Sequence, residues 1–286
     1  SGEFKLVLPY KLPLILGNDV AGSVVGIGSR VTRFKLGDEV YARPSKDRIG
    51  TFAEYIAINE ADAARKPTNL TMQQAAAIPL AALTAWQALV DIAKVKPGQR
   101  VFIQAGSGGV GTIAIQIAKH LGAFVATTTS TPNVEWVKSL GADIVIDYKT
   151  QDFTAELRDY DVVLNSLGTQ ELIQSLQILK RGGVLVSISG PPTPTFADEI
   201  GLLWMVKQVI KLLSYSVRKK ADQQGVNYSF LFMRANGDQL SQITQLVESG
   251  VIRPIIDRVF PFDATADALA YAELGKVKGK TIIQMA

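Results

Sequence analysis

A glycine-rich turn between an apolar strand and a helix constrains this chain more than any other feature. Residues 105–111 are Ala-Gly-Ser-Gly-Gly-Val-Gly, which contains the spacing G-x-G-x-x-G. An apolar segment, Val101–Ile103, precedes the turn, and a helix with apolar residues on one face follows it. In such a turn Gly106 permits the tight bend, Gly108 lets the backbone approach a pyrophosphate, and Gly111 lets the helix pack on the strand. Because the first N–H groups of the helix can bind phosphate, the sequence predicts a dinucleotide site.

The chain after residue 100 alternates apolar strands with amphipathic helices. This alternation predicts parallel pairing with right-handed crossovers, and therefore an α/β fold with a Rossmann doubly wound sheet. The expected strands are Val101–Gln104, Phe124–Thr128, Ile144–Asp147, Asp161–Leu164, Val184–Ile188 and Tyr228–Phe232. The expected helices between them are Val110–Leu121, Asn133–Leu140 and Gln170–Leu179.

The two ends of the chain predict a second, smaller β domain. Strands and turns are expected over Ala21–Gly28, Phe34–Tyr41 and Gly50–Ile58, where β-branched residues and glycines mix. Two helices and a closing strand are expected near the C-terminus, at Gln239–Val247, Ala264–Leu274 and Thr281–Met285. We therefore expect a small β domain of residues 1–76 with 237–286 and a dinucleotide-binding domain of residues 77–236.

The end of the second expected strand favours NADPH over NADH. An NAD site has an acidic residue there, roughly 20 residues past the glycines, which binds the ribose hydroxyls. Here Ser130 and Thr131 follow the strand, and the first acid, Glu135, falls inside the next helix. Hydroxyls can donate hydrogen bonds to a 2′-phosphate that a carboxylate would repel. Thr131 could equally serve only as a helix cap, and Tyr148 is a second candidate donor.

Composition argues against metal chemistry and gives little support for a macromolecular partner. The chain has no cysteine and a single histidine, His120, so the usual sulfur and imidazole ligands of zinc are missing. The net charge of +4 is small, and an anionic cofactor accounts for it as well as a nucleic acid would. No secretory signal is visible at the N-terminus, so we expect a cytoplasmic protein, as a monomer or homodimer.

The ordered motifs resemble the medium-chain dehydrogenase/reductase superfamily, specifically its zinc-free quinone oxidoreductase and alkenal reductase branch. The matching segments are Leu16–Gly22, Phe34–Val40, Gly50–Tyr55, Ala77–Pro79, Leu83–Trp86, Ser139–Asp143 and Gly279–Ile283. The resemblance implies a GroES-like β-rich catalytic domain, N-terminally shortened because relatives have further strands before the position of Ser1. Zinc-dependent members carry a histidine at the position of Asn18, so the resemblance also implies a zinc-independent enzyme.

The same resemblance assigns the cofactor contacts residue by residue. It implies that Thr84 lies near the nicotinamide and that Ser130 and Tyr148 bind the 2′-phosphate. Many relatives have a lysine at about the position of Asn133, which weakens the case for NADPH here. The other implied contacts lie in the glycine turn and at later strand ends: Ser107, Gly108, Gly109, Val110, Leu167, Gly168, Ser189, Gly190, Phe230, Leu231 and Phe232. Gly106 and Gly111 belong to the predicted cofactor site through the glycine motif itself.

The activity implied by the resemblance is hydride transfer from NADPH to a small electrophile, either a quinone or the C=C bond of an α,β-unsaturated carbonyl. A phenol or an ordered water would supply the proton. Tyr10 and Tyr41 are candidates for that phenol, with plain packing as the competing interpretation. Two other functions stay open at this point: an enoyl-thioester reductase and a non-catalytic NADPH-binding scaffold.

The segment from Glu199 to Gln224 is unusual in carrying an apolar helical face followed by Arg218-Lys219-Lys220. The favoured interpretation is a helix of the core or of a subunit interface, with a solvated basic end. A contact with a membrane surface is the weaker alternative.

Overall fold

The computed structural model describes residues 13–285 and divides into two compact units. Unit 1 combines the N-terminal residues up to Leu83 with the C-terminal residues from Met233 onward. Unit 2 is the continuous segment from Thr84 to Phe232. The chain therefore leaves unit 1, completes unit 2, and then returns to unit 1.

A parallel six-stranded sheet forms the centre of unit 2, which confirms the predicted doubly wound α/β class. The strands follow the order β6-β5-β4-β7-β8-β9, and every adjacent pair is parallel. The strand order reverses between β4 and β7, and ligands of such sheets bind at the carboxyl ends of the strands beside this reversal. The strands are β4 (Arg100–Ile103), β5 (Phe124–Thr129), β6 (Ile144–Asp147), β7 (Tyr160–Asn165), β8 (Leu179–Ser187) and β9 (Asn227–Phe230).

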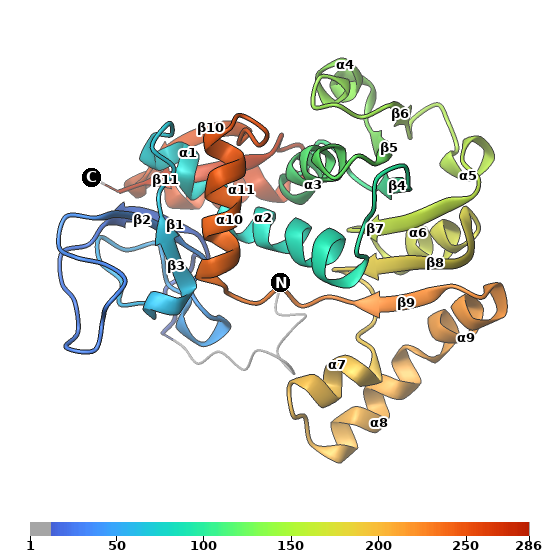
Figure 1. The fold of residues 1–286 in the computed structure, drawn as a ribbon, viewed down its shortest axis with the longest axis horizontal. Helices are drawn as coiled ribbons and strands as arrows, with labels where there is room; N and C mark the ends of the chain where they lie inside the picture. The colour runs from blue at the N-terminus through green and yellow to red at the C-terminus, as the bar shows by residue number, and fades with distance from the viewer. Residues whose placement is uncertain (1–12, 286) are drawn as a thin grey trace. The chain divides into compact units, whose positions relative to one another are not determined.

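Helices cover both faces of this sheet (Figure 1): α3 (Gly109–His120) lies on one side, and α6 (Thr169–Leu176) and α9 (Tyr215–Gln224) lie on the other. Every residue of β7 is buried, as expected for a strand covered on both faces. The helix expected to reach Leu179 ends at Leu176, because Leu179 already pairs with Tyr160. The shorter helical elements are η3 (Gln87–Ile92), η4 (Thr131–Asn133), α4 (Val134–Lys138) and α5 (Phe153–Glu156).

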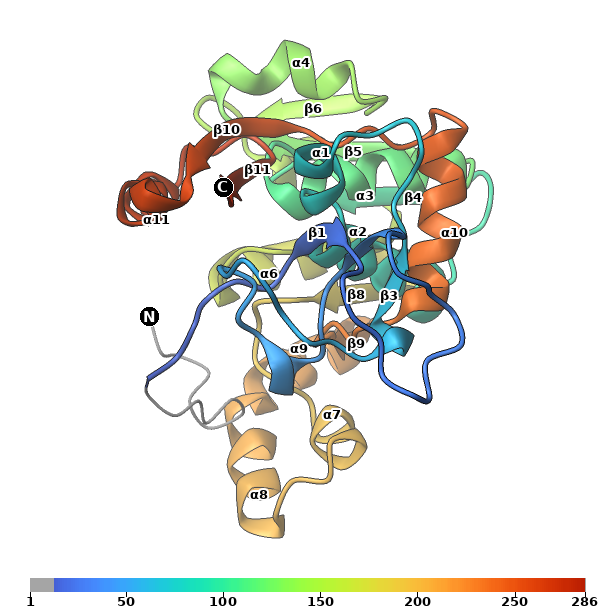
Figure 2. The same cartoon turned by 90° about the vertical axis from the view of Figure 1, so that its left-hand side faces the viewer.

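Two further helices, α7 (Pro194–Glu199) and α8 (Trp204–Leu213), lie beyond β9 (Figures 1 and 2). Phe196 of α7 packs against Phe230 of β9, whereas α8 lies away from the sheet in both views. Only Ile210 of α8 is buried. The apolar segment that the sequence assigned to a core or an interface is therefore not part of the core of unit 2. None of the helices within residues 13–285 combines the length and the apolarity needed to cross a membrane.

Unit 1 has two small sheets. Strands β1 (Val20–Ser23), β2 (Glu39–Ala42) and β3 (Ala63–Arg65) pair antiparallel, whereas β10 (Ile256–Pro261) and β11 (Lys280–Gln284) pair parallel. The other elements are η1 (Lys46–Arg48), η2 (Glu60–Asp62), α1 (Met72–Ala76), α10 (Gly237–Glu248), η5 (Phe262–Ala264) and α11 (Thr265–Glu273), and α2 (Pro79–Trp86) crosses into unit 2. The strand expected over residues 50–58 is wrong, because this segment joins no sheet among the described residues.

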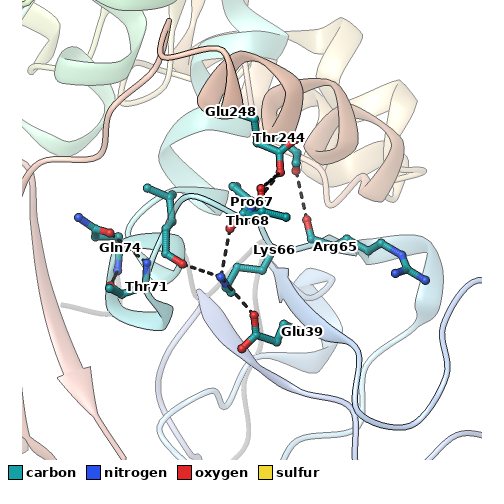
Figure 3. A network of polar contacts seen from close by, with 10 residues as sticks. Glu39, Arg65, Lys66, Pro67, Thr68, Thr71, Gln74, Thr244 and Glu248 are labelled. Carbon is teal, nitrogen blue, oxygen red and sulfur yellow. Dashed lines mark hydrogen bonds and ion pairs between the residues drawn. The ribbon is translucent and has the colours of Figure 1, made fainter.

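A polar network fixes α10 to the end of β3 (Figure 3). The buried ammonium group of Lys66 donates to the carbonyl oxygens of Pro67 and Leu70 and forms an ion pair with Glu39 at 3.2 Å. Both the backbone N–H and the hydroxyl of Thr68 donate to Glu248 on α10, at 2.8 Å each. These bonds lower the pKa of Glu248, the backbone bond from Thr68 first. Residues about 180 positions apart in the chain are thereby held together.

The core of unit 2 generates a stability prediction at Phe102. This side chain is fully buried and stacks on Phe153 at 5.0 Å between ring centroids. We expect Phe102→Ala to lower the free energy of unfolding of unit 2 by about 3–5 kcal/mol, because it removes apolar contacts and leaves a cavity. Urea unfolding followed by tryptophan fluorescence measures this loss, since Trp86, Trp136 and Trp204 all lie in unit 2. Phe124→Ala, at a partly exposed position, is the matched control, and an equal loss there would contradict the assignment.

Candidate functional site

The turn after β4 has the geometry of a strand–turn–helix junction. Ala105 has φ of +51°, a left-handed conformation that residues other than glycine rarely adopt. Its N–H donates to the hydroxyl of Thr128 at 3.2 Å, and the N–H of Gly106 donates to the carbonyl of Thr128 at 2.8 Å. A Cβ atom at Gly106 would lie 2.3 Å from the Thr127 hydroxyl oxygen. The turn is therefore pinned against β5 and has room only for glycine at Gly106.

Helix α3 begins directly at this turn, and its first turn carries no side-chain cap. Gly108 is the N-cap residue, so the N–H groups at Gly109, Val110 and Gly111 have neither an intrahelical acceptor nor a capping side chain. A Cβ atom at Gly111 would lie 2.2 Å from the carbonyl oxygen of Ala105, which shows how closely the helix packs on the turn. Uncapped N–H groups with the positive end of the helix dipole are suited to bind a pyrophosphate.

A buried hydrogen-bonded network joins the carboxyl ends of β4, β7 and β8. The amide of Asn165 donates to Gln104 Oε1 at 2.6 Å, and the hydroxyl of Ser187 donates to Asn165 Oδ1 at 2.5 Å. Gln104 also donates to the hydroxyl of Ser175 at 2.8 Å, and the N–H of Gly190 donates to Ser187 at 2.8 Å. Because Gln104, Asn165 and Ser187 are buried and mutually satisfied, the network holds the loops after β7 and β8 in fixed positions.

The hydroxyl groups of Ser130 and Thr131, directly after β5, differ in whether their proton is free to form a hydrogen bond with a ligand. The Thr131 hydroxyl donates to Asp147 at 2.6 Å, and this bond is the main cause that lowers the pKa of Asp147. The single hydroxyl proton of Thr131 is thereby used in this bond. The Ser130 hydroxyl instead accepts a bond from the Asn133 amide at 3.0 Å, which leaves its own proton available. Ser130 is therefore better placed than Thr131 to donate to an added phosphate.

A cation that the sequence analysis missed lies beside this pair. The backbone N–H of Tyr148 donates to the Thr129 carbonyl at 3.1 Å, so Tyr148 sits at the carboxyl edge next to Ser130. The ammonium group of Lys149 lies 5.1 Å from the centroid of the exposed Tyr148 ring. The only signal in the sequence is that Lys149 follows an expected strand end directly.

The remaining predicted contacts lie at later strand ends. Gly168 is the N-cap of α6, and the Ser189 hydroxyl donates to the Leu167 carbonyl, so the loops after β7 and β8 touch. Gly190 is buried, and a Cβ there would lie 2.5 Å from Leu172. The N–H of Leu231 donates to the Ser187 carbonyl at 2.8 Å, while Phe230 and Phe232 lie 5.0 and 6.0 Å from Phe196 between ring centroids.

The expected contacts outside these loops have different surroundings. Thr84 is buried within α2 rather than at a strand end. Tyr41 is fully buried in unit 1, where its hydroxyl donates to the Leu240 carbonyl at 2.8 Å, and burial raises its pKa. A buried tyrosine that is bonded to the backbone and resists ionisation has a packing role, so we give it no proton-donor role. Tyr10 lies outside the described residues.

An open cavity of about 910 Å³ lies within unit 1. It is lined by β1, the segment 53–58 and the end of β11. Its volume is in the range of small-molecule sites. None of the predicted site residues within 13–285 lines it, so the cavity adds nothing to the case for a dinucleotide site.

The side chains present do not suit zinc. The full sequence has one histidine and no cysteine, and among residues 13–285 no three histidine, cysteine or carboxylate side chains gather as a metal site requires. Asn18, at the position where the family resemblance places a zinc-ligating histidine, offers only a neutral amide. We therefore derive no chemistry through a metal.

Comparison with known proteins supports this description. The family model described as "Alcohol dehydrogenase GroES-like domain" matches residues 2–68, and the one described as "Zinc-binding dehydrogenase" matches residues 140–283. A similar protein is "NAD(P)H oxidoreductase RTN4IP1, mitochondrial" of Bos taurus, 36% identical over 285 residues, which cover 96% of this chain and 71% of the relative. Another is "NADPH-dependent alkenal/one oxidoreductase, chloroplastic" of Arabidopsis thaliana, 36% identical over 294 residues, which cover 99% of this chain and 67% of the relative.

A solved structure shares the whole described fold. The quinone oxidoreductase from Coxiella burnetii matches with a TM-score of 0.86 and 32% identity, over 100% of this chain and 84% of that one. The names of the relatives also correct one expectation. The cytoplasmic location expected from the sequence is wrong, because similar proteins are named mitochondrial or chloroplastic and point to an organelle.

The glycine turn generates a prediction that separates ligand binding from folding. A Cβ at Gly108 would lie 3.3 Å from the Ala105 carbonyl oxygen, which a small shift can accommodate. We expect Gly108→Ala to weaken dinucleotide binding by about tenfold or more, because the methyl group keeps phosphate from the backbone. Its thermal midpoint should stay near that of the unaltered protein.

Gly111→Ala is the informative comparison for this prediction. Its Cβ would collide with backbone rather than with a movable side chain, so we expect it to lower both stability and binding. Gly28→Ala, where no atom lies within 4 Å of the added Cβ, should change neither. Fluorescence titration and circular dichroism melting measure the two properties. Unchanged binding in Gly108→Ala would remove the pyrophosphate assignment.

Proposed function

We propose a reaction for this chain from the premise that it belongs to the medium-chain dehydrogenase/reductase superfamily, whose members similar to it are nicotinamide-dependent oxidoreductases. The reaction is the NADPH-dependent, zinc-independent reduction of a small conjugated acceptor, a quinone or the C=C bond of an α,β-unsaturated carbonyl. The observation that carries the proposal is the uncapped start of α3 beside the free hydroxyl of Ser130. The names of the relatives support the acceptor class.

The residues present fit a dinucleotide at the carboxyl edge of the sheet. Gly106, Ser107 and Gly108 form a turn without large side chains, and the N–H groups of Gly109, Val110 and Gly111 would hold the pyrophosphate. The network of Gln104, Asn165 and Ser187 positions the loops that would enclose the rest of the cofactor. The members of these loops are Leu167, Gly168, Ser189, Gly190 and the segment Phe230–Phe232.

Three side chains support NADPH over NADH. Ser130 has a proton to donate, Tyr148 offers an exposed ring and a hydroxyl, and Lys149 brings a positive charge beside that ring. Lys149 would thereby replace the lysine that many relatives have at about the position of Asn133. Asp147 opposes this preference only weakly, because the Thr131 hydroxyl and the Lys149 N–H both bond to its carboxylate.

When bound, the nicotinamide supplies a hydride, and the protein's task is to orient it and to exclude competing reactions. The fixed loops after β7 and β8 would set that orientation, because their buried network leaves little freedom. With Tyr41 bonded inside unit 1, we assign the proton to a solvent molecule rather than to a tyrosine of the described residues.

An enoyl thioester is a second candidate acceptor. Two enoyl reductases of solved structure, CurK and JamJ, match this chain at TM-scores of 0.78 and 0.81 with 26% identity each. A thioester-linked enoyl group is also an α,β-unsaturated carbonyl, so the same hydride addition would reduce it. The two acceptors differ in size, because an enoyl thioester carries a thioester-linked group that the protein must also accommodate, whereas a free alkenal does not.

Cofactor preference gives the first prediction of this proposal. We expect Ser130→Asp to weaken NADPH binding more than NADH binding, because it sets a carboxylate against the 2′-phosphate. We expect Lys149→Ala to weaken NADPH binding by about tenfold and to leave NADH binding unchanged. Lys138→Ala, an exposed lysine of the neighbouring α4, is the matched control. Calorimetric titration of both cofactors measures these affinities, and equal changes for NADPH and NADH would remove this site.

Acceptor choice gives the second prediction. We expect the protein to oxidise NADPH with a small quinone or an alkenal, measured side by side by the loss of absorbance of the reduced cofactor. Chelation of metal ions should leave the rate unchanged, because the donor set does not suit zinc. Turnover only with a crotonyl thioester would favour the enoyl-thioester reductase. Tight cofactor binding without turnover of any acceptor would indicate a scaffold protein instead.

A further inference from the structure

Helix α8 presents an apolar surface that no other described element covers. Its exposed members, together with the residues at its two ends, are called the α8 face here and are between 51% and 78% exposed: Leu203, Trp204, Met205, Val209, Leu212, Leu213 and Tyr215. Met205, Val209, Leu212 and Leu213 follow the spacing i, i+4, i+7, i+8, so they form one stripe along the helix. Soluble proteins rarely leave a contiguous apolar stripe of this kind in water.

Positive charge surrounds the α8 face. From Leu203 to Ala221 the chain has five basic residues and no acidic one. Lys207 pairs with Asp198 of α7 at 2.7 Å, whereas Lys211, Lys219 and Lys220 are exposed. The stripe therefore combines apolar side chains with several exposed cations, and acidic residues flank the segment only at Asp198, Glu199 and Asp222.

Helices α8 and α9 follow each other end to end through the single residue Ser214, and side-chain bonds hold this junction, so the surface exists before any partner binds. Buried Ser214 joins the two helices, and its hydroxyl donates to the Ile210 carbonyl at 2.8 Å. Arg218 of α9 donates to Ser214 at 3.1 Å and to the carbonyl of Lys211 at 3.1 Å. Figures 1 and 2 show α8 at the outer side of this group of helices, away from the sheet of unit 2.

We propose that the α8 face docks this protein on a lipid bilayer with anionic headgroups. The apolar stripe enters the boundary between headgroups and acyl chains, and Lys211, Lys219 and Lys220 bind the negative surface. Trp204, at the start of the stripe, has the amphipathic ring that favours this depth. The docking does not depend on the proposed reaction, although both quinones and alkenals can reside in membranes.

A second copy of the chain suits this surface less well. In a twofold contact the same patch lies on both sides of the interface. The lysines around one stripe would then face the lysines around the other, and the segment from Leu203 to Ala221 has no carboxylate; the flanking acids are Asp198, which already pairs with Lys207, Glu199 and Asp222. An anionic bilayer instead satisfies the apolar stripe and the cations together.

The test is co-sedimentation with vesicles of phosphatidylcholine alone and of equal parts phosphatidylcholine and phosphatidylglycerol. We expect binding to the anionic vesicles only, weakened by added salt. The double variant Met205→Glu/Leu212→Glu should abolish binding. Lys219→Glu/Lys220→Glu should weaken it by about tenfold or more. The matched controls are Leu274→Glu and Lys276→Glu/Lys278→Glu, at exposed positions of unit 1, and both should bind as the unaltered protein does.

A second measurement needs no variant that alters folding. In the unaltered protein the fluorescence of exposed Trp204 should shift to the blue on binding, and brominated lipid should quench it. Trp204→Phe should remove the shift while retaining most of the binding. Equal binding to both vesicle types, no binding to either, or binding unaffected by the α8 substitutions would overturn the proposal. The proposal would also be overturned if the protein did not bind vesicles but formed a dimer in sedimentation velocity, and if Met205→Glu/Leu212→Glu dissociated that dimer.

Discussion

The contact between the Ala105 carbonyl and the Cα side of Gly111 is the constraint on which unit 2 depends. A side chain at Gly111 would come within 2.2 Å of that oxygen, so the helix can approach the turn only because glycine is present. This approach aims the first N–H groups of α3 along the carboxyl edge of the sheet. Since all six strands run parallel, the loops that follow β4, β5, β6, β7 and β8 come to the same edge. One backbone contact therefore sets where the start of α3 meets these five loops, which is the place proposed for the dinucleotide.

Buried polar side chains stabilise that edge where apolar packing ends. Asn165, with its whole side chain buried, bonds to both Gln104 and Ser187 and so connects three neighbouring strands. An unsatisfied amide at this depth would cost about 1–3 kcal/mol, so the three residues depend on one another. The arrangement fixes the geometry of these strand ends with uncharged side chains only. That suits a reduction in which the cofactor provides the chemistry and the protein provides position.

The sequence predicted the elements that depend on local pattern. It did not predict features that depend on contacts with residues far away in the chain. The turn at Gly106–Gly111 and all six parallel strands followed from apolar periodicity and glycine spacing. Residues 50–58 have a strand-like pattern, but a strand also needs a neighbour along its length. Here the backbone bonds to Leu16 and Gly17 involve only residues 50–52, and the segment joins no sheet among the described residues. Both Ser130 and Thr131 are candidate donors in the sequence, and only the structure shows that the Thr131 hydroxyl donates to Asp147, 16 residues away. Tyr41 and the α8 segment show the same limit, because burial of a tyrosine and exposure of an apolar helix are both set by tertiary packing.

The discontinuity of unit 1 has a consequence for biosynthesis. The Tyr41 hydroxyl finds its acceptor on Leu240, 199 residues later in the chain. At elongation rates of about 5–20 residues per second, the first half of unit 1 waits on the order of 10–40 s for α10 to be translated. During that interval unit 2 is synthesised whole and can fold as an independent insertion. During synthesis the N-terminal part of unit 1 therefore still lacks its C-terminal partner when unit 2 is already complete.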